Sequence, residues 1–186
     1  MYFTKSRLKS SNYVYNFSER NVANEDINSF DIFLSHSYAD KDYIGELKRI
    51  LEEVYGYTVY VDWITDGYKL DRNNVSKETA DLIKTRMKQS NSMIFATSSN
   101  SPNSKWMPWE LGYFDSFSQG KIAILPITEN SNDSFEGQEY LALYPYITEE
   151  YFDKSDKKTL WINETKKEYV IFDKWLKENK QPYIHD

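Results

Sequence analysis

From residue 30 onward, short apolar runs alternate with segments in which apolar residues recur every three or four positions. Residues 32–34 (IFL), 93–96 (MIFA) and 122–125 (IAIL) are apolar throughout, as expected for strands that are buried on both faces. The segments between them have the spacing of amphipathic helices. This alternation predicts βαβ units, and therefore an α/β fold with a central parallel sheet.

The same pattern gives the order of the strands. We predict strands at residues 32–34, 58–63, 93–97 and 122–127, followed by a fifth within residues 140–147 and a short one at residues 159–162. Polar loops are expected at residues 64–75 and 98–104, where small and turn-forming residues gather.

Four helices are predicted between and after these strands. Asp40 and Ser76 are candidate N-caps of the first two, Gly56 ends the first, and the third runs from about Trp106 to Gly120. The apolar residues that define helical faces are Ile44, Leu47, Leu51 and Val54; then Ala80, Ile83 and Met87; and, in a closing helix, Ile171, Phe172, Trp175 and Leu176.

The first 29 residues do not continue this alternation. They are polar with scattered aromatic side chains, and we expect an N-terminal arm or cap outside the main fold. Residues 30–186 are then one domain, since a chain of 186 residues suits a single domain with a sizeable core.

Composition excludes several classes of protein. The chain has no cysteine and two histidines, which excludes disulfide scaffolds and cysteine nucleophiles and leaves no metal site to be expected. The six glycines form no dinucleotide fingerprint, P-loop or nucleophile elbow. A net charge of −6 with scattered basic residues argues against nucleic acid as a partner. Without an apolar run of roughly 18 residues or a secretory leader, we expect a cytoplasmic protein with no membrane partner.

These exclusions leave carboxylate chemistry or no chemistry, and two segments point to a carboxylate. Residues 30–36 (FDIFLSH) read as a buried strand that ends in polar residues, and residues 104–115 (SKWMPWELGYFD) as the start of a helix. Trp106 and Glu110 are four positions apart, so they share one helical face. Strand ends and helix starts meet at one edge of an open α/β sheet, where such folds build their sites. The alternative for Glu110 is a solvated carboxylate that complements the helix dipole.

Together these segments resemble the TIR (Toll/interleukin receptor) domain family. FDIFLSH is similar to the first-strand box of that family, and Trp106 to Glu110 matches its W-x-x-x-E pattern. The resemblance covers residues 30–127, and residues 106–115 are especially similar to bacterial TIR proteins of anti-phage defence, including the Thoeris type. It implies a flavodoxin-like fold of about five parallel strands with helices on both faces. It also implies that Glu110 is the catalytic residue for cleaving NAD.

A single carboxylate is chemically sufficient for that reaction. The nicotinamide of NAD carries a positive charge on its ring nitrogen and leaves as a neutral molecule, so no general acid is needed. The charge moves to the ribose as an oxocarbenium-like ion, which one nearby carboxylate stabilises. Most glycosidases need two carboxylates because their leaving group must be protonated.

Other candidate substrate-binding residues lie near the same edge. Trp106 either stacks on an aromatic ring of the ligand or belongs to the core. Ser35 either holds a phosphate or ribose, together with nearby main-chain N–H groups, or simply ends the strand. His36 stands where TIR domains commonly have an aromatic residue, and it either stacks or forms a hydrogen bond. Phe33 either packs in the core or lines the floor of the site.

Three further candidates follow from the resemblance. Asp62 matches an aspartate at the end of a family strand, where it either contacts the ligand or fixes the following loop. Residues 64–75 correspond to the BB loop, which gates the site in enzymatic relatives and joins neighbouring subunits. Leu70 and Arg72 are the contact residues expected in that loop.

The leading hypothesis is therefore an NAD glycohydrolase or ADP-ribosyl cyclase that releases ADP-ribose or a cyclic ADP-ribose signal. NAD is the substrate, and no cofactor is expected. The resemblance implies a homo-oligomer formed through TIR–TIR contacts, and a separate effector protein that senses the product. Two alternatives stay open: a non-catalytic TIR interaction module, and an enzyme similar to nucleoside deoxyribosyltransferases.

Overall fold

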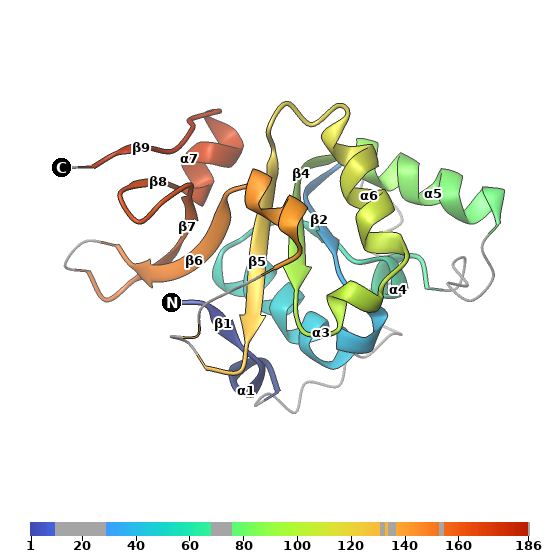
Figure 1. Cartoon of the computed structure of the whole chain (residues 1–186), viewed down its shortest axis with the longest axis horizontal. Helices are drawn as coiled ribbons and strands as arrows, with labels where there is room; N and C mark the ends of the chain where they lie inside the picture. The colour runs from blue at the N-terminus through green and yellow to red at the C-terminus, as the bar shows by residue number, and fades with distance from the viewer. Residues whose placement is uncertain (10–28, 68–75, 131–132, 134–136, 153–154, 186) are drawn as a thin grey trace.

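Five parallel strands form the centre of the sheet, as predicted. A computed structural model of the chain describes residues 1–9, 29–67, 76–130, 133, 137–152 and 155–185. The central strands lie in the order β3-β2-β4-β5-β6, and each neighbouring pair is parallel (Figure 1). Their bounds are β2 Phe30–Ser35, β3 Val59–Tyr60, β4 Ser90–Thr97, β5 Ile122–Thr128 and β6 Tyr146–Tyr151.

Short strands extend this sheet at its β6 side and next to β5. Beyond β6 lie the antiparallel strands β7 Lys158–Asn163, β8 Glu168–Ile171 and β9 Tyr183–Ile184. Strand β1 Phe3–Thr4 pairs in parallel with the end of β5. The prediction at residues 159–162 identified β7. The sequence pattern did not predict β1, β8 and β9, because strands of two to four residues are too short for a period-2 pattern.

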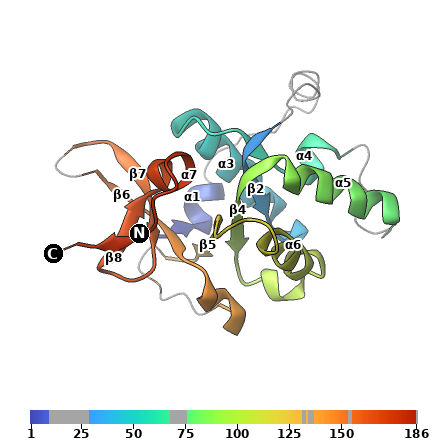
Figure 2. The same ribbon diagram turned by 90° about the horizontal axis from the view of Figure 1, so that it is seen from above.

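Helices cover both faces of the sheet, which confirms the predicted layers (Figure 2). The helices are α1 Lys5–Lys9, α3 Lys41–Arg49 with a π-helical continuation Ile50–Val54, α4 Asp62–Thr65, α5 Lys77–Lys88, α6 Trp106–Asp115 and α7 Phe172–Lys177. Short 3₁₀ turns occupy Tyr38–Asp40, Ser101–Asn103 and Glu139–Leu143. None of the helices within these described stretches is long and apolar enough to cross a bilayer.

Buried apolar side chains of the described residues form two clusters, one on each face of the sheet. Along β4, Ile94 and Ala96 belong to the cluster packed under α1, α3 and α7, whereas Met93 and Phe95 belong to the cluster under α5 and α6. This alternation is what a strand buried on both faces requires. It explains why residues 93–96 are apolar at every position.

Two predicted helix caps have different outcomes. Ser76 caps α5 as predicted, since its hydroxyl accepts a hydrogen bond from the Thr79 N–H at 3.1 Å. Asp40 forms no side-chain cap on α3. Its carboxylate instead accepts hydrogen bonds from Ser98 Oγ at 2.6 Å and Asn100 Nδ2 at 2.7 Å. Asp40 therefore occupies the predicted N-cap position, but the predicted side-chain cap is wrong, because a long-range pair of donors binds the same oxygens.

The first predicted helix ends where expected but loses its register. Gly56 has a φ of +79°, a left-handed conformation that ends the helix. The π-helical turn just before it contains Val54, which is 60% exposed rather than buried. A π turn is wider than an α turn, so it rotates the last apolar position off the buried face.

Several boundaries differ from the predictions. Helix α6 ends at Asp115, and Gly120 closes the following turn with a φ of +81°. Strand β3 covers only two residues of the predicted 58–63, and Asp62 opens helix α4 instead of ending the strand. Within residues 140–147 the chain forms a 3₁₀ turn, and β6 begins at Tyr146.

The chain start is part of the fold rather than an arm outside it. Phe3 and Leu8 are 0% and 1% exposed and belong to the cluster under α1 and α3. They add apolar surface to that core, and β1 adds hydrogen bonds to β5. The expectation of an arm or cap outside the main fold is wrong for residues 1–9, and residues 10–28 lie outside the described part of the chain.

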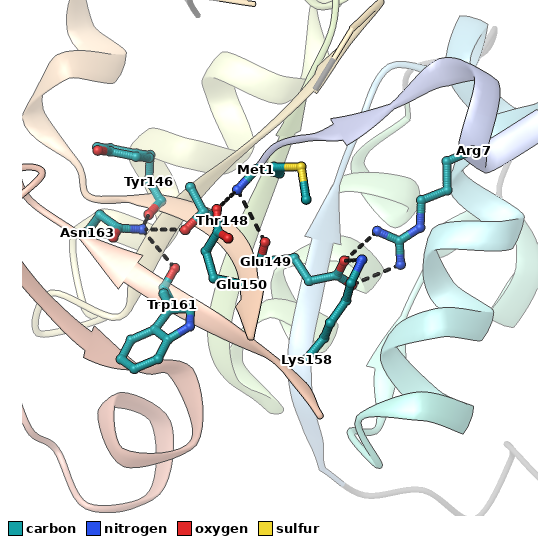
Figure 3. Close-up of polar contacts among 9 residues, drawn as sticks. All are labelled: Met1, Arg7, Tyr146, Thr148, Glu149, Glu150, Lys158, Trp161 and Asn163. Carbon is teal, nitrogen blue, oxygen red and sulfur yellow. Dashed lines mark hydrogen bonds and ion pairs between the residues drawn. The ribbon is translucent and has the colours of Figure 1, made fainter. Parts of the chain in front are cut away.

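A buried carboxylate fastens this segment to the sheet (Figure 3). Glu149 on β6 receives two hydrogen bonds from the Arg7 guanidinium, at 2.7 and 2.8 Å, and one from the Tyr55 hydroxyl at 2.6 Å. Lys158 adds an ion pair at 3.2 Å. Burial by itself raises the pKa of Glu149, but these donors and charges outweigh it and lower the pKa from 4.5 to about 2.

This arrangement predicts a stability loss in acid. Because the folded-state pKa of Glu149 lies below its unfolded value, its contribution is full above about pH 4.5 and is lost as the pH falls toward 2. Urea unfolding followed by circular dichroism measures the free energy of unfolding at each pH. Between pH 4.5 and pH 2.5 this free energy should fall more steeply in the wild type than in Glu149→Gln. The half-exposed Glu178, replaced by Gln, should keep the wild-type slope. Equal slopes in wild type and Glu149→Gln would contradict this assignment.

Candidate active site at the switch point of the sheet

The strand order reverses between β2 and β4. The chain leaves β2 toward β3 on one side, crosses back through α5, and continues from β4 to β5 on the other side. The loops that follow β2 and β4 therefore diverge, and open α/β sheets bind ligands at such a point, beyond the carboxyl ends of the strands. Ser35 is the last residue of β2 and pairs in register with Phe95 of β4.

Glu110 meets the end of β2 at this point. It lies in the second turn of α6, and Pro108 in the first turn is compatible with a regular helix that starts at Trp106. The Ser35 hydroxyl donates a hydrogen bond of 2.6 Å to Glu110 Oε2. The two residues expected at one edge of the sheet are thus in direct contact.

Burial distinguishes this glutamate from an ordinary helix-start carboxylate. Glu110 is 1% exposed, as is Ser35. Removing a carboxylate from water is costly unless hydrogen bonds compensate, so natural proteins rarely bury one without a reason. The interpretation of Glu110 as a solvated carboxylate is therefore wrong.

A second buried carboxylate joins the two loops that diverge at the switch point. Asp40, which follows β2, is 0% exposed, and its donors Ser98 and Asn100 follow β4. Ser98 also donates its backbone N–H to Ser101 Oγ at 2.9 Å, which shapes the loop that leads into α6. This network was missed at the sequence level, where Asp40 was explained as a helix cap. It fixes the segment from which Glu110 projects.

His36 and Asp62 lie next to the same edge and close to each other. The Trp63 indole N–H donates to His36 Nε2 at 3.0 Å, and His36 Nδ1 lies 2.8 Å from the Leu34 carbonyl oxygen. An indole N–H only donates and a carbonyl only accepts, so the proton of the neutral ring belongs on Nδ1. Asp62 Oδ1 lies 3.7 Å from His36 Nε2. His36 thus forms hydrogen bonds, one of the two roles expected for it.

The remaining candidates are placed differently. Phe33 is 2% exposed and stacks on Tyr60 with ring centroids 5.2 Å apart, so it packs in the core and does not line the site. Trp106 is half-buried and meets Trp109 edge-to-face at 5.4 Å. Leu70 and Arg72 lie outside the described residues.

Two contacts hold the start of the segment that contains Leu70 and Arg72. Arg86 on α5 forms two hydrogen bonds, at 2.8 and 2.9 Å, with the carboxylate of Asp66, which is 1% exposed. The next residue, Gly67, has no room for a side chain, because a Cβ there would lie 2.2 Å from the Trp63 carbonyl oxygen. The chain therefore leaves α4 in a fixed direction.

Fold and motif together place the chain in a family. The sequence pattern of the TIR domain family matches residues 32–160, which is most of the chain. The protein belongs to the TIR domain family.

Two bacterial proteins and one solved structure are similar to this chain. Over 193 aligned positions, covering 95% of this chain and 98% of the other, it is 46% identical to the Bacillus cereus (strain MSX-D12) protein named "Probable 3′ cyclic ADP-D-ribose synthase ThsB′". It is 31% identical over 118 positions, 63% of this chain and 29% of the other, to "Putative cyclic ADP-D-ribose synthase TIR2" of Cytobacillus dafuensis. The TIR domain of the Toll-related receptor TRR-2 from Hydra magnipapillata is a structural match at 17% identity and a TM-score of 0.43, covering 61% of this chain and 78% of that one.

Substitution of Gly67 tests how tightly the start of its segment is determined. Gly67→Ala should lower the midpoint of thermal unfolding, because the added methyl group meets backbone that cannot move freely. Gly112→Ala in α6 is the matched control, since among the described residues no atom beyond its chain neighbours and its own helix turn lies within 4 Å of its Cβ position. Alanine should stabilise that helix by about 0.5–1 kcal/mol. Similar midpoints for the two variants would show that residue 67 is not constrained as described.

Proposed function

We propose that this protein breaks the nicotinamide–ribose bond of NAD, with Glu110 as the catalytic carboxylate. The observation that carries the proposal is the buried hydrogen bond of 2.6 Å between Ser35 and Glu110 at the switch point of the sheet. The resemblance to a protein named as a cyclic ADP-D-ribose synthase, across nearly the whole chain, supports NAD as the substrate.

The proposed chemistry uses the carboxylate as an electrostatic stabiliser. When the bond between the ribose anomeric carbon and the nicotinamide nitrogen breaks, the electron pair goes to the nicotinamide, which leaves neutral. The positive charge that develops on the ribose is stabilised by Glu110, and this effect is strong because water is excluded from its surroundings. Substrate ribose hydroxyls take the place of the Ser35 hydroxyl as donors to the carboxylate. Ser35 is then a positioning residue that holds Glu110 in place before NAD binds.

The acceptor of the ribosyl group decides the product. Attack by water gives ADP-ribose, whereas attack by the adenine ring or a ribose hydroxyl of the same molecule gives a cyclic ADP-ribose. The printed names of both bacterial relatives favour the cyclic product for this chain. In the proposed role the product is a diffusible signal in cytoplasmic anti-phage defence, read by a separate effector protein. We also propose that copies of this chain form a homo-oligomer through TIR–TIR contacts.

The charge on Glu110 is the feature to test first. Glu110→Gln keeps the shape of the side chain and removes its charge, so nicotinamide release should fall by about 10²-fold or more. Mass spectrometry of products formed from NAD at high protein concentration measures this, and the mass of the second product separates ADP-ribose from a cyclic form. Glu164→Gln, in an exposed turn between β7 and β8, is the control and should keep wild-type turnover.

Two outcomes would count against the proposal. Normal turnover by a Glu110→Gln protein with a wild-type circular dichroism spectrum would remove Glu110 from the reaction. A wild-type protein that releases no nicotinamide, even in lysate from phage-infected cells, would favour the non-catalytic interaction module.

A further inference from the structure

A separate cavity opens at the carboxyl ends of β4 and β5. It encloses roughly 430 Å³, within the range of about 300–1,000 Å³ that small-molecule sites occupy. Its lining residues come from the ends of these strands and from the start of α1, and Figure 1 shows α1 and β1 next to the end of β5. The described residues that line it do not include Ser35 or Glu110, so it is distinct from the carboxylate site.

Hydroxyl groups and one ion pair dominate the lining. Thr97, Ser98 and Ser99 come from the end of β4 and its loop, and Thr128 comes from the end of β5. Lys5 at the start of α1 projects between these strands. It donates to Glu129 Oε1 at 2.5 Å and to Ser99 Oγ at 3.1 Å.

The charges in the cavity select the kind of ligand. The hydrogen bond to Glu129 raises the pKa of Lys5, which stays charged, and the carboxylate balances that charge, so the ion pair does not make a phosphate site. A second carboxylate, Asp133, also lines the cavity, together with the Gln138 amide. The described lining residues are therefore rich in hydrogen-bond acceptors and together carry a net negative charge. It suits a neutral ligand whose own hydroxyl groups donate.

We propose that this cavity binds the ribose of a nucleoside. A vicinal diol offers two donors to one carboxylate, the arrangement by which acidic residues hold ribose in dinucleotide-binding folds. Glu129 is the suitable acceptor, because 69% of its side chain is exposed and its carboxylate has lone pairs beyond the one that accepts from Lys5. The Ser99 hydroxyl donates to a remaining ribose oxygen, and Pro102 supplies an apolar contact for the base.

One loop lines the cavity and also leads to the helix that carries Glu110. Ser98, Ser99 and Pro102 belong to the loop that leads into α6, and Ser98 also binds Asp40. The ribose therefore comes from one of two sources: the adenosine end of the NAD held at Glu110, or a separate nucleoside. The first source rests on the proposed function, whereas the second is independent of it.

Isothermal titration with adenosine and 2′,3′-dideoxyadenosine tests the proposal. Adenosine should bind at least about tenfold more tightly than the analogue without the diol, because the analogue lacks both hydrogen-bond donors to the charged carboxylate. Glu129→Gln and Ser99→Ala should weaken adenosine binding, and Glu164→Gln should not. Glu129 and Ser99 lie at the surface of the cavity, so neither variant is expected to unfold the chain.

A Glu110→Gln protein separates this site from the active site. Adenosine binding that survives in Glu110→Gln and is lost in Glu129→Gln supports the cavity, whatever becomes of NAD cleavage. Loss in Glu110→Gln with retention in Glu129→Gln would overturn it, as would equal binding of the two nucleosides or none at millimolar concentration. If these results support the site, the KM for NAD of the Glu129→Gln protein identifies the source of the ribose. A raised KM identifies the adenosine end of NAD, and an unchanged KM identifies a separate nucleoside.

Discussion

A carboxylate stays buried only when donors satisfy it, and this requirement shapes the centre of the molecule. Glu110 receives the Ser35 hydroxyl from a position 75 residues earlier in the chain. The contact forms only if β2 ends level with the second turn of α6. The parallel register of β2 with β4 fixes the position of Ser35, and the loop after β4 fixes the start of α6.

Two further carboxylates act in the same way at other places. Asp40 holds together the loops that leave β2 and β4, and Glu149 holds the N-terminal segment against β6 (Figure 3). Each joins parts of the chain that are at least 58 residues apart. Breaking one partner of such a buried group is expected to cost several times more than losing a surface pair. The polar contacts therefore fix how the elements meet, while the two apolar clusters supply most of the free energy of folding.

The sequence predicts most of the central strands and helices, because these elements follow from local hydrophobic patterns. Runs such as residues 93–96 identify the central strands, and Trp106 and Glu110 identify the start of α6. The bond from Trp63 to His36 was missed, because long-range side-chain pairs leave no periodic signal. For the same reason the donors of Asp40 were not foreseen. Phe3 and Leu8 were assigned to an external arm because two buried residues in a polar segment resemble scattered hydrophobic residues of a tail.

The most direct test of the central claim is a crystal structure of the Glu110→Gln protein with NAD bound. If Glu110 stabilises the developing charge on ribose, the anomeric carbon of the nicotinamide ribose should lie within about 4 Å of the side chain at position 110, where opposite charges interact strongly. The ribose hydroxyls should then occupy the position of the Ser35 hydroxyl. NAD bound elsewhere, with the side chain at position 110 still covered and bonded to Ser35, would contradict the account.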